Sequence, residues 1–126
     1  MLFVEDNDVS RELVRRIFQR MKQIKVDLAK DGQEALLLTE RYAYHIIFMD
    51  LQMPIMDGFD VAREIRRREA LLDSYTPVVA VTAYTGEEDR RRCREAGMDG
   101  FLSKPINTED MMEMIRHYIP CLETFL

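Results

Sequence analysis

Two hydrophobic periodicities alternate along the chain. Short apolar runs at residues 1–4, 46–49, 78–81 and 101–102, and apolar residues at every second position of 24–28, predict five β-strands. Between the strands, apolar residues recur every three or four positions, which indicates helices. These helices are expected over residues 9–21, from Gly32 to Leu38, over 59–72 and 86–96, and after Asn107, with Asp8 and Asn107 as N-terminal caps.

The regular alternation of strand and helix indicates an α/β protein. Without internal repeats or a linker, the 126 residues suit one domain, residues 1–126. A strand followed by a helix five times over predicts a doubly wound, five-stranded parallel sheet with helices on both faces. In such a sheet the ligand crevice lies beyond the carboxyl ends of the strands.

Composition narrows the class of protein. Hydrophobic residues make up 47% and charged residues 33%, and no apolar run approaches the roughly 20 residues that span a bilayer, so we expect no membrane contact. The start of the chain lacks the pattern of a secretory signal, which favours a cytoplasmic location. A net charge of -5 argues against a nucleic-acid partner.

Local clusters leave some alternatives open. Arg66 to Arg68 and Arg90 to Arg92 fall in predicted helices, where they form either a solvated face or a docking patch for an acidic partner. Two cysteines, Cys93 and Cys121, lack metal-ligand spacing and are expected to be reduced. The two histidines, His45 and His117, have no second ligand nearby, so a zinc site is not expected.

Polar residues follow four of the five predicted strands directly. Glu5 and Asp6 follow the first strand, Asp50 the third, Thr82 the fourth and Lys104 the fifth. Because the carboxyl ends of parallel strands meet at one edge of a sheet, we expect these side chains to converge.

Three converging carboxylates repel one another unless a cation lies between them. Mg²⁺ suits this set because it takes one or two carboxylates and completes its shell with water and phosphoryl oxygens. Lys104 and Thr82 then contact further phosphoryl oxygens, and Asp50 acts as attacking carboxylate or as a ligand. The alternative is a purely structural salt-bridge cluster of Asp6, Asp50 and Lys104.

Four segments at these strand ends resemble one family. They read VEDN at residues 4–7, MDLQMPIMDG at 49–58, VVAVTAYT at 78–85 and GMDGFLSKPI at 97–106. In this order and at these separations, they make the chain similar to a response-regulator receiver domain over essentially its full length. The DGFLSKPI segment resembles the corresponding segment in receivers of hybrid sensor histidine kinases more than that in receivers fused to DNA-binding domains.

The resemblance implies a flavodoxin-like fold with strand order 2-1-3-4-5 and a phosphoacceptor function. Asp50 would receive a phosphoryl group from a phosphohistidine of a sensor histidine kinase or histidine phosphotransfer domain. The Mg²⁺ ligands would be Glu5, Asp6, Asp50 and the main-chain carbonyl of Gln52. Apart from assisting its own phosphorylation and dephosphorylation, such a domain is not an enzyme.

The resemblance also implies a conformational switch. Lys104 would pair with the phosphoryl group, and a cis peptide bond between Lys104 and Pro105 would orient it. Thr82 would move toward the phosphoryl oxygens, and Phe101 would turn inward into the space that Thr82 leaves. The fourth helix, fifth strand and fifth helix would then present the altered surface to a partner.

Three alternatives share part of this pattern. A degenerate receiver that only binds proteins usually lacks an acid, the Thr or the Lys, and none is missing here. A flavodoxin-like nucleotide binder needs a Ser/Thr/Gly loop after the first strand, where Glu5 and Asp6 would repel phosphate. A phosphatase of the haloacid dehalogenase type has a second acid two residues after its nucleophile, where this chain has Gln52.

Overall fold

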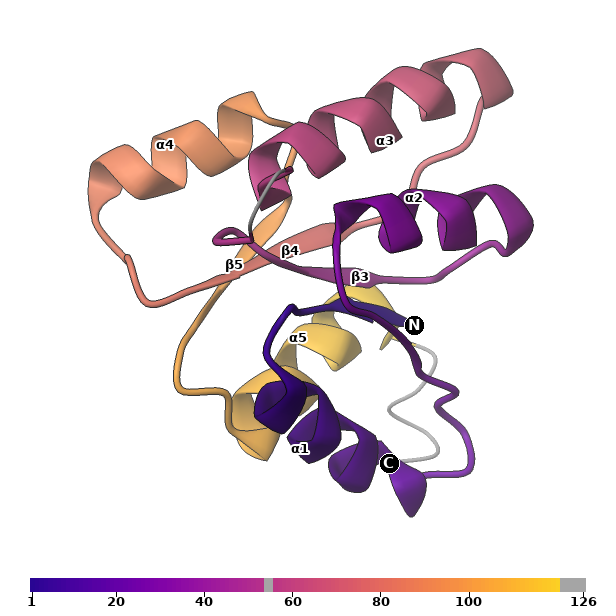
Figure 1. Cartoon of the computed structure of the whole chain (residues 1–126), viewed down its shortest axis with the longest axis vertical. Helices are drawn as coiled ribbons and strands as arrows, with labels where there is room; N and C mark the ends of the chain where they lie inside the picture. Colours follow the sequence, from indigo (N-terminus) through magenta and orange to yellow (C-terminus); the bar gives the residue numbers. More distant parts are fainter. Residues whose placement is uncertain (54–55, 121–126) are drawn as a thin grey trace.

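Five parallel strands form the central sheet of the computed structural model, which describes residues 1–53 and 56–120 (Figure 1). Their spatial order is β2-β1-β3-β4-β5. The strands are β1 (Leu2–Val4), β2 (Asp27–Ala29), β3 (Ile47–Asp50), β4 (Val78–Thr82) and β5 (Gly100–Ser103). Both the parallel direction of every pair and the strand order confirm the predicted fold.

Five helices cover the two faces of this sheet (Figure 1). Helices α1 (Asp8–Gln19) and α5 (Thr108–Tyr118) lie on one face. Helices α2 (Gly32–Arg41), α3 (Gly58–Leu72) and α4 (Glu87–Glu95) lie on the other. No helix of the described residues is long and apolar enough to cross a membrane.

The sheet separates two apolar clusters. Leu2 and Val4 of β1 belong to the cluster beneath α2 and α3, whereas Phe3 belongs to the cluster with α1 and α5. Successive side chains of a strand point to opposite faces, which explains this division. Every residue of β3 and β4 is buried, as expected for central strands covered on both faces. The ends of these two strands are therefore rigidly placed.

The first helix begins at Asp8, one residue earlier than predicted. Asp8 was expected to be the cap, and this prediction is wrong: Asn7 has extended backbone and its side chain accepts a hydrogen bond from Ser10 N at 3.0 Å. Asp8 is the first helical residue, where a negative charge also stabilises the positive end of the helix. The predicted cap at Asn107 is confirmed, since its Oδ1 accepts a hydrogen bond from Asp110 N at 2.8 Å.

The second strand is shorter than the alternation at residues 24–28 predicts. Only Asp27–Ala29 pairs with β1, because β1 itself offers just three residues, Leu2–Val4. Ile24 is nevertheless buried, against the cluster that contains Phe3. The apolar residue at every second position of 24–28 therefore does not mark a strand over the whole segment. Ile24 is buried although it lies before β2.

The arginine clusters lie on α3 and α4, and most of their partners lie on the same helix. Arg67 and Arg68 bind Glu64, and Arg91 binds Glu88. Arg67 and Arg91 thus fit a solvated helix face, whereas Arg66 is mostly buried and also binds Asp99 outside its helix. Cys93 is buried and unpaired, and burial raises the pKa of its thiol. Cys121 and Pro54, which belongs to the MDLQMPIMDG segment, lie outside the described residues.

Candidate functional site

The candidate site lies where the winding of the sheet reverses, between β1 and β3. Glu5 follows β1 directly, and Asp50 is the last residue of β3. Val4 and Met49 are register partners, so the two acids leave adjacent strands at the same level. A crevice beyond the carboxyl ends of the strands at such a reversal is the expected ligand position in this kind of sheet.

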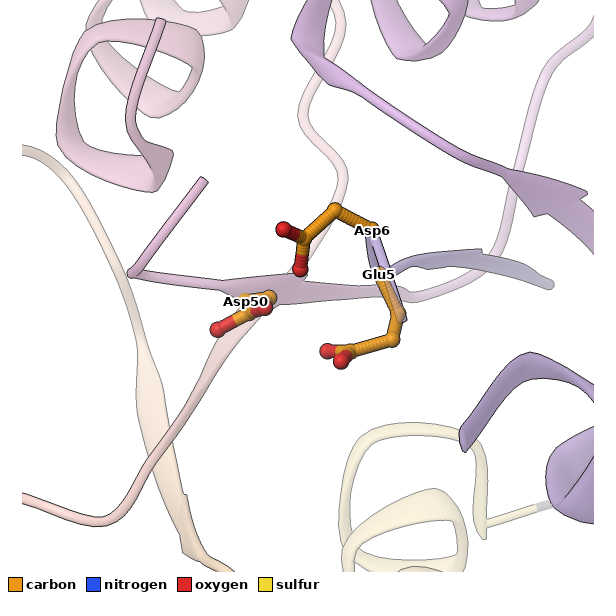
Figure 2. A group of neighbouring side chains, drawn as sticks. All are labelled: Glu5, Asp6 and Asp50. Carbon is orange, nitrogen blue, oxygen red and sulfur yellow. The ribbon is translucent and has the colours of Figure 1, made fainter. Parts of the chain in front are cut away.

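Three carboxylates converge there, as predicted. Figure 2 shows the side chains of Glu5, Asp6 and Asp50 pointing toward one another from the ends of β1 and β3. One carboxylate oxygen from each lies within 4.8 Å of the others. Glu5 and Asp50 are each only 1% exposed, whereas Asp6 is exposed to solvent. The cluster is therefore open on one side and desolvated on the other.

The two oxygens of Asp50 have different surroundings. Its Oδ1 accepts hydrogen bonds from Gln52 N at 3.1 Å and from Lys104 Nζ at 3.3 Å. Its Oδ2 is buried and has no hydrogen-bond partner among the described residues. Glu5 Oε2 is in the same situation, although Lys104 Nζ lies 3.5 Å away. Buried carboxylate oxygens without partners are costly, and a bound cation would remove this cost.

The pKa values of Glu5 and Lys104 reflect the cost of burying these charged groups. The pKa of Glu5 is raised to about 7, mainly by burial and in addition by the neighbouring carboxylate of Asp50. Burial by itself lowers the pKa of Lys104, but the charges of Asp50 and Glu5 outweigh this effect and leave the pKa raised. Lys104 is thus firmly protonated, and one cation faces three acids.

The fourth and fifth strands bring the remaining predicted residues to the same edge. Thr82 ends β4 beside Ser103 of β5, and Lys104 N donates a hydrogen bond to the carbonyl of Thr82 at 2.9 Å. The peptide bond between Lys104 and Pro105 is cis, as the family resemblance implied. Thr82 is 1% exposed, and its Oγ1 accepts a hydrogen bond from Tyr84 N at 3.0 Å.

Phe101 lies on β5, two residues before Ser103. It is paired with Ala80 of β4 and is partly buried against the cluster under α3. Gln52 is exposed, and its main-chain N–H supports Asp50.

Sequence reasoning missed two residues that shape the site. Arg11 of α1 reaches back and donates a hydrogen bond from Nη1 to the carbonyl of Glu5 at 2.7 Å. Nothing in the local pattern marks Arg11, because it lies in a helix and not at a strand end. Gly58 has no side chain that could mark it as part of the site, but it is the first residue of α3, and Asp57 is the cap.

Gly58 permits a very close approach between α3 and the end of β3. A Cβ atom at this position would lie 2.4 Å from the carbonyl oxygen of Asp50 and 2.9 Å from Leu51 Cα. Both contacts are with main-chain atoms, so they cannot be relieved by turning a side chain. The absence of a side chain at Gly58 thus allows the main chain of Asp50 to take its position.

The donor set fits Mg²⁺. All candidate ligands are hard oxygen atoms, and two of them are buried carboxylate oxygens without a partner. Mg²⁺ prefers such oxygens and retains several waters, for which the exposed side at Asp6 leaves room.

Comparison with known families decides the class of protein. The family model for the response regulator receiver domain matches residues 1–116. The chain belongs to the response regulator receiver domain family. This receiver domain is 37% identical over 123 residues to the osmosensing histidine protein kinase SLN1 of Saccharomyces cerevisiae, a match that spans 94% of this chain and 10% of the kinase. The curated relatives that it matches are far longer, since the chain spans only 6% to 12% of their length.

Solved structures agree with the assignment. The receiver domain of the Saccharomyces cerevisiae response regulator Ssk1, solved together with the histidine phosphotransfer protein Ypd1, superimposes with a TM-score of 0.86 at 30% identity, over 97% of this chain and 88% of that one. The receiver domain of the Arabidopsis thaliana histidine kinase CKI1, complexed with Mg²⁺ and BeF₃⁻, gives a TM-score of 0.81 at 36% identity, over 93% and 87% of the two chains.

Proposed function

We propose that this receiver domain accepts a phosphoryl group on Asp50 from a phosphohistidine. The single observation that carries the proposal is the position of the Asp50 carboxylate. It is buried at the end of a central strand, Lys104 and the Gln52 N–H bind one oxygen, and the other oxygen has no partner among the described residues. A carboxylate held in this way is oriented for attack before the phosphodonor arrives.

The transfer forms one bond and breaks one. A carboxylate oxygen of Asp50 attacks phosphorus, the P–N bond to the donor histidine breaks, and the imidazole nitrogen keeps the electron pair of that bond. Lys104, which lies 3.3 Å from Asp50 Oδ1, supplies positive charge to the phosphoryl oxygens. Glu5, Asp6, Asp50 and the Gln52 carbonyl would hold Mg²⁺. The bound ion would neutralise the charge between these acids and the incoming phosphoryl group.

Thr82 and Phe101 connect the acyl phosphate to the surface. The Thr82 hydroxyl would turn from its contact with Tyr84 N toward a phosphoryl oxygen, and Phe101 would move into the space that it leaves. A covalent modification shifts a conformational equilibrium only through interactions that differ between the two states. The hydrogen bond from Thr82 is such an interaction, and its effect would be read on α4, β5 and α5.

The relatives suggest the partners. SLN1 and CKI1 are histidine kinases, and the Ssk1 receiver domain was solved with a histidine phosphotransfer protein. We infer that the partner here is a sensor histidine kinase or a histidine phosphotransfer domain, within or beside a hybrid kinase. We further propose that residues 1–126 act as one receiver domain, in the cytoplasm, without catalysis beyond their own phosphorylation and dephosphorylation.

A mass measurement tests this function. The protein is incubated with a small-molecule phosphodonor and Mg²⁺, and its mass is compared with that of Asp50→Asn treated in the same way. A gain of one phosphoryl group in the parent, absent without Mg²⁺ and absent in Asp50→Asn, is the expected result. No gain in the parent would favour the degenerate, interaction-only receiver, and an equal gain in Asp50→Asn would place the reaction at another residue.

A further inference from the structure

Helix α4 presents little apolar surface to the rest of the domain. Of its nine residues only Cys93 is buried, and the other eight all carry a charge. A helix without an apolar face depends on its specific contacts to stay in place. Two of the contacts that α4 makes are arginine side chains placed over aromatic rings.

The two arginines lie over different elements. The guanidinium of Arg92 lies 4.5 Å from the ring centroid of Phe59, in the first turn of α3. The guanidinium of Arg90 lies 5.4 Å from the ring centroid of Phe101, on β5. Both distances are within the range of a cation–π interaction. Arg91, between them in the chain, instead binds Glu88 and Glu95 on its own helix.

Arg90 differs from its neighbour in having no acidic partner. Within residues 1–53 and 56–120, Arg90 forms no ion pair, so the ring of Phe101 is the contact that places its guanidinium. Phe101 is partly buried in this position, and it is the aromatic residue that would turn inward on phosphorylation. An inward turn of the ring would break its contact with the guanidinium of Arg90.

We propose that Arg90 restrains Phe101 in the position seen here and thereby opposes the phosphorylated conformation of the domain. The inference rests on the proposed function, because it concerns the same switch. The contact between Arg90 and the Phe101 ring is present in the conformation seen here and would be lost in the phosphorylated conformation. It therefore shifts the conformational equilibrium toward the unphosphorylated state. Arg90 is thus a positioning residue that sets how readily the switch responds.

The effect of Arg90 on Phe101 can be tested without detaching α4, because Arg92 also holds this helix. Its contact with Phe59 joins α4 to α3 and does not involve Phe101. Loss of the Arg90 contact therefore leaves α4 attached through Arg92 and Cys93. The expected effect is a shift of the switch and not a detached helix.

The test is the affinity for beryllofluoride in the presence of saturating Mg²⁺, followed by NMR for the parent, Arg90→Gln and Arg91→Gln. The two variants remove the same charge from the same helix, but only Arg90→Gln removes the aromatic contact. A cation–π contact at an exposed site corresponds to about a two- to fivefold change in an equilibrium. We expect Arg90→Gln to bind beryllofluoride about two- to fivefold more tightly than Arg91→Gln, which should match the parent.

A second pair of variants isolates the ring. In a Phe101→Leu background, Arg90→Gln should have no further effect on beryllofluoride affinity. Equal affinities of Arg90→Gln and Arg91→Gln, weaker binding by Arg90→Gln, or an undiminished effect in the Phe101→Leu background would each overturn the inference while leaving the proposed function intact. A parent protein that binds no beryllofluoride with Mg²⁺ would overturn both.

Discussion

Lys104 Nζ lies 3.3 Å from Asp50 Oδ1, although the two residues are 54 positions apart in the chain. The parallel sheet produces this contact, because β3 and β5 both end at the edge where Asp50 is buried. The same ammonium group lies 3.5 Å from Glu5 Oε2. Lys104 therefore compensates two buried acids at once, and the consequences of removing it can be measured.

Replacing Lys104 with Gln should destabilise the metal-free protein. The change leaves Asp50 and Glu5 buried without their cation, and an unsatisfied buried charged group costs roughly 1–3 kcal/mol or more. Urea unfolding at pH 8 in the presence of a chelator measures the loss. Arg91→Gln removes an equal charge from an exposed pair and should change the free energy of unfolding by less than about 0.5 kcal/mol. Equal effects of the two substitutions would contradict this role of Lys104.

The metal-free protein should lose stability as the pH rises from about 4.5 to 7. Glu5 has a pKa of about 7 in the folded chain, against 4.5 without its surroundings, mainly because it is buried. Between these values the folded state binds more protons than the unfolded state, so the free energy of unfolding falls as the pH rises. The full loss is on the order of 3 kcal/mol, because the two pKa values differ by about 2.5 units and each unit corresponds to about 1.4 kcal/mol.

Unfolding at pH 5 and pH 8 in metal-free buffer, for the parent and Glu5→Gln, measures this effect. Glu5→Gln should lose this part of the pH dependence, because the amide does not titrate. Mg²⁺ added at pH 8 should restore stability to the parent, since it binds the ionised carboxylates of the folded state only. A parent whose stability changes with pH in the same way as that of Glu5→Gln would show that Glu5 is not the group responsible.

Asp6→Asn should weaken Mg²⁺ binding by about tenfold or more, because it removes a charged ligand from the cluster. Titration with Mg²⁺ by calorimetry measures the affinity. Asp8→Asn is the matched control, since Asp8 lies two residues further along and its side chain is 91% exposed and bound to Arg11. Asp8→Asn should bind Mg²⁺ nearly as the parent does, and an equal loss in both variants would indicate a nonspecific effect of charge.

Gly58→Ala should disturb the proposed phosphorylation site, because the added methyl group would collide with the main chain of Asp50. The added Cβ would lie 2.4 Å from the carbonyl oxygen of Asp50, so α3 or the end of β3 must move. We expect a loss of roughly 1–3 kcal/mol in stability, as for other overpacked sites, together with slower phosphorylation of Asp50.

Gly86→Ala provides the comparison for Gly58→Ala. A Cβ at Gly86 would meet only the end of the Asp89 side chain at 3.2 Å, and this side chain can turn away. Thermal unfolding and the mass assay with a phosphodonor should therefore show a clearly smaller change for Gly86→Ala. A Gly58→Ala variant phosphorylated at the parent rate would mean that the close approach is not needed for the reaction.

Much of the site could be predicted from local pattern alone. Each apolar run that ended in a polar residue located one strand end, and the five-fold alternation implied that these ends share one edge. Glu5, Asp6, Asp50, Thr82 and Lys104 were all found in this way, and the structure brings them to that edge. Their chemical roles stay predictions, for which phosphorylation and metal binding are the tests.

Other features depended on contacts that leave no local trace. Asp8 and Asn7 are both good capping residues, and only the backbone geometry selects Asn7. The alternation at residues 24–28 is real, but the short β1 limits β2 to three paired residues. Arg11 reaches Glu5, and Arg90 reaches Phe101, through side chains that can extend in many directions.

The sequence by itself determined the order of strands and helices, and with it the set of acidic and basic groups at one edge of the sheet. The spacing of apolar residues within a segment indicates which of its side chains are buried. This spacing is visible in each short segment by itself, so no information on distant parts of the chain is needed. Tertiary structure alone decided which oxygen of Asp50 is engaged, how closely Gly58 approaches it, and which rings the arginines of α4 cover. These features depend on distances between segments far apart in the chain, which are set by packing.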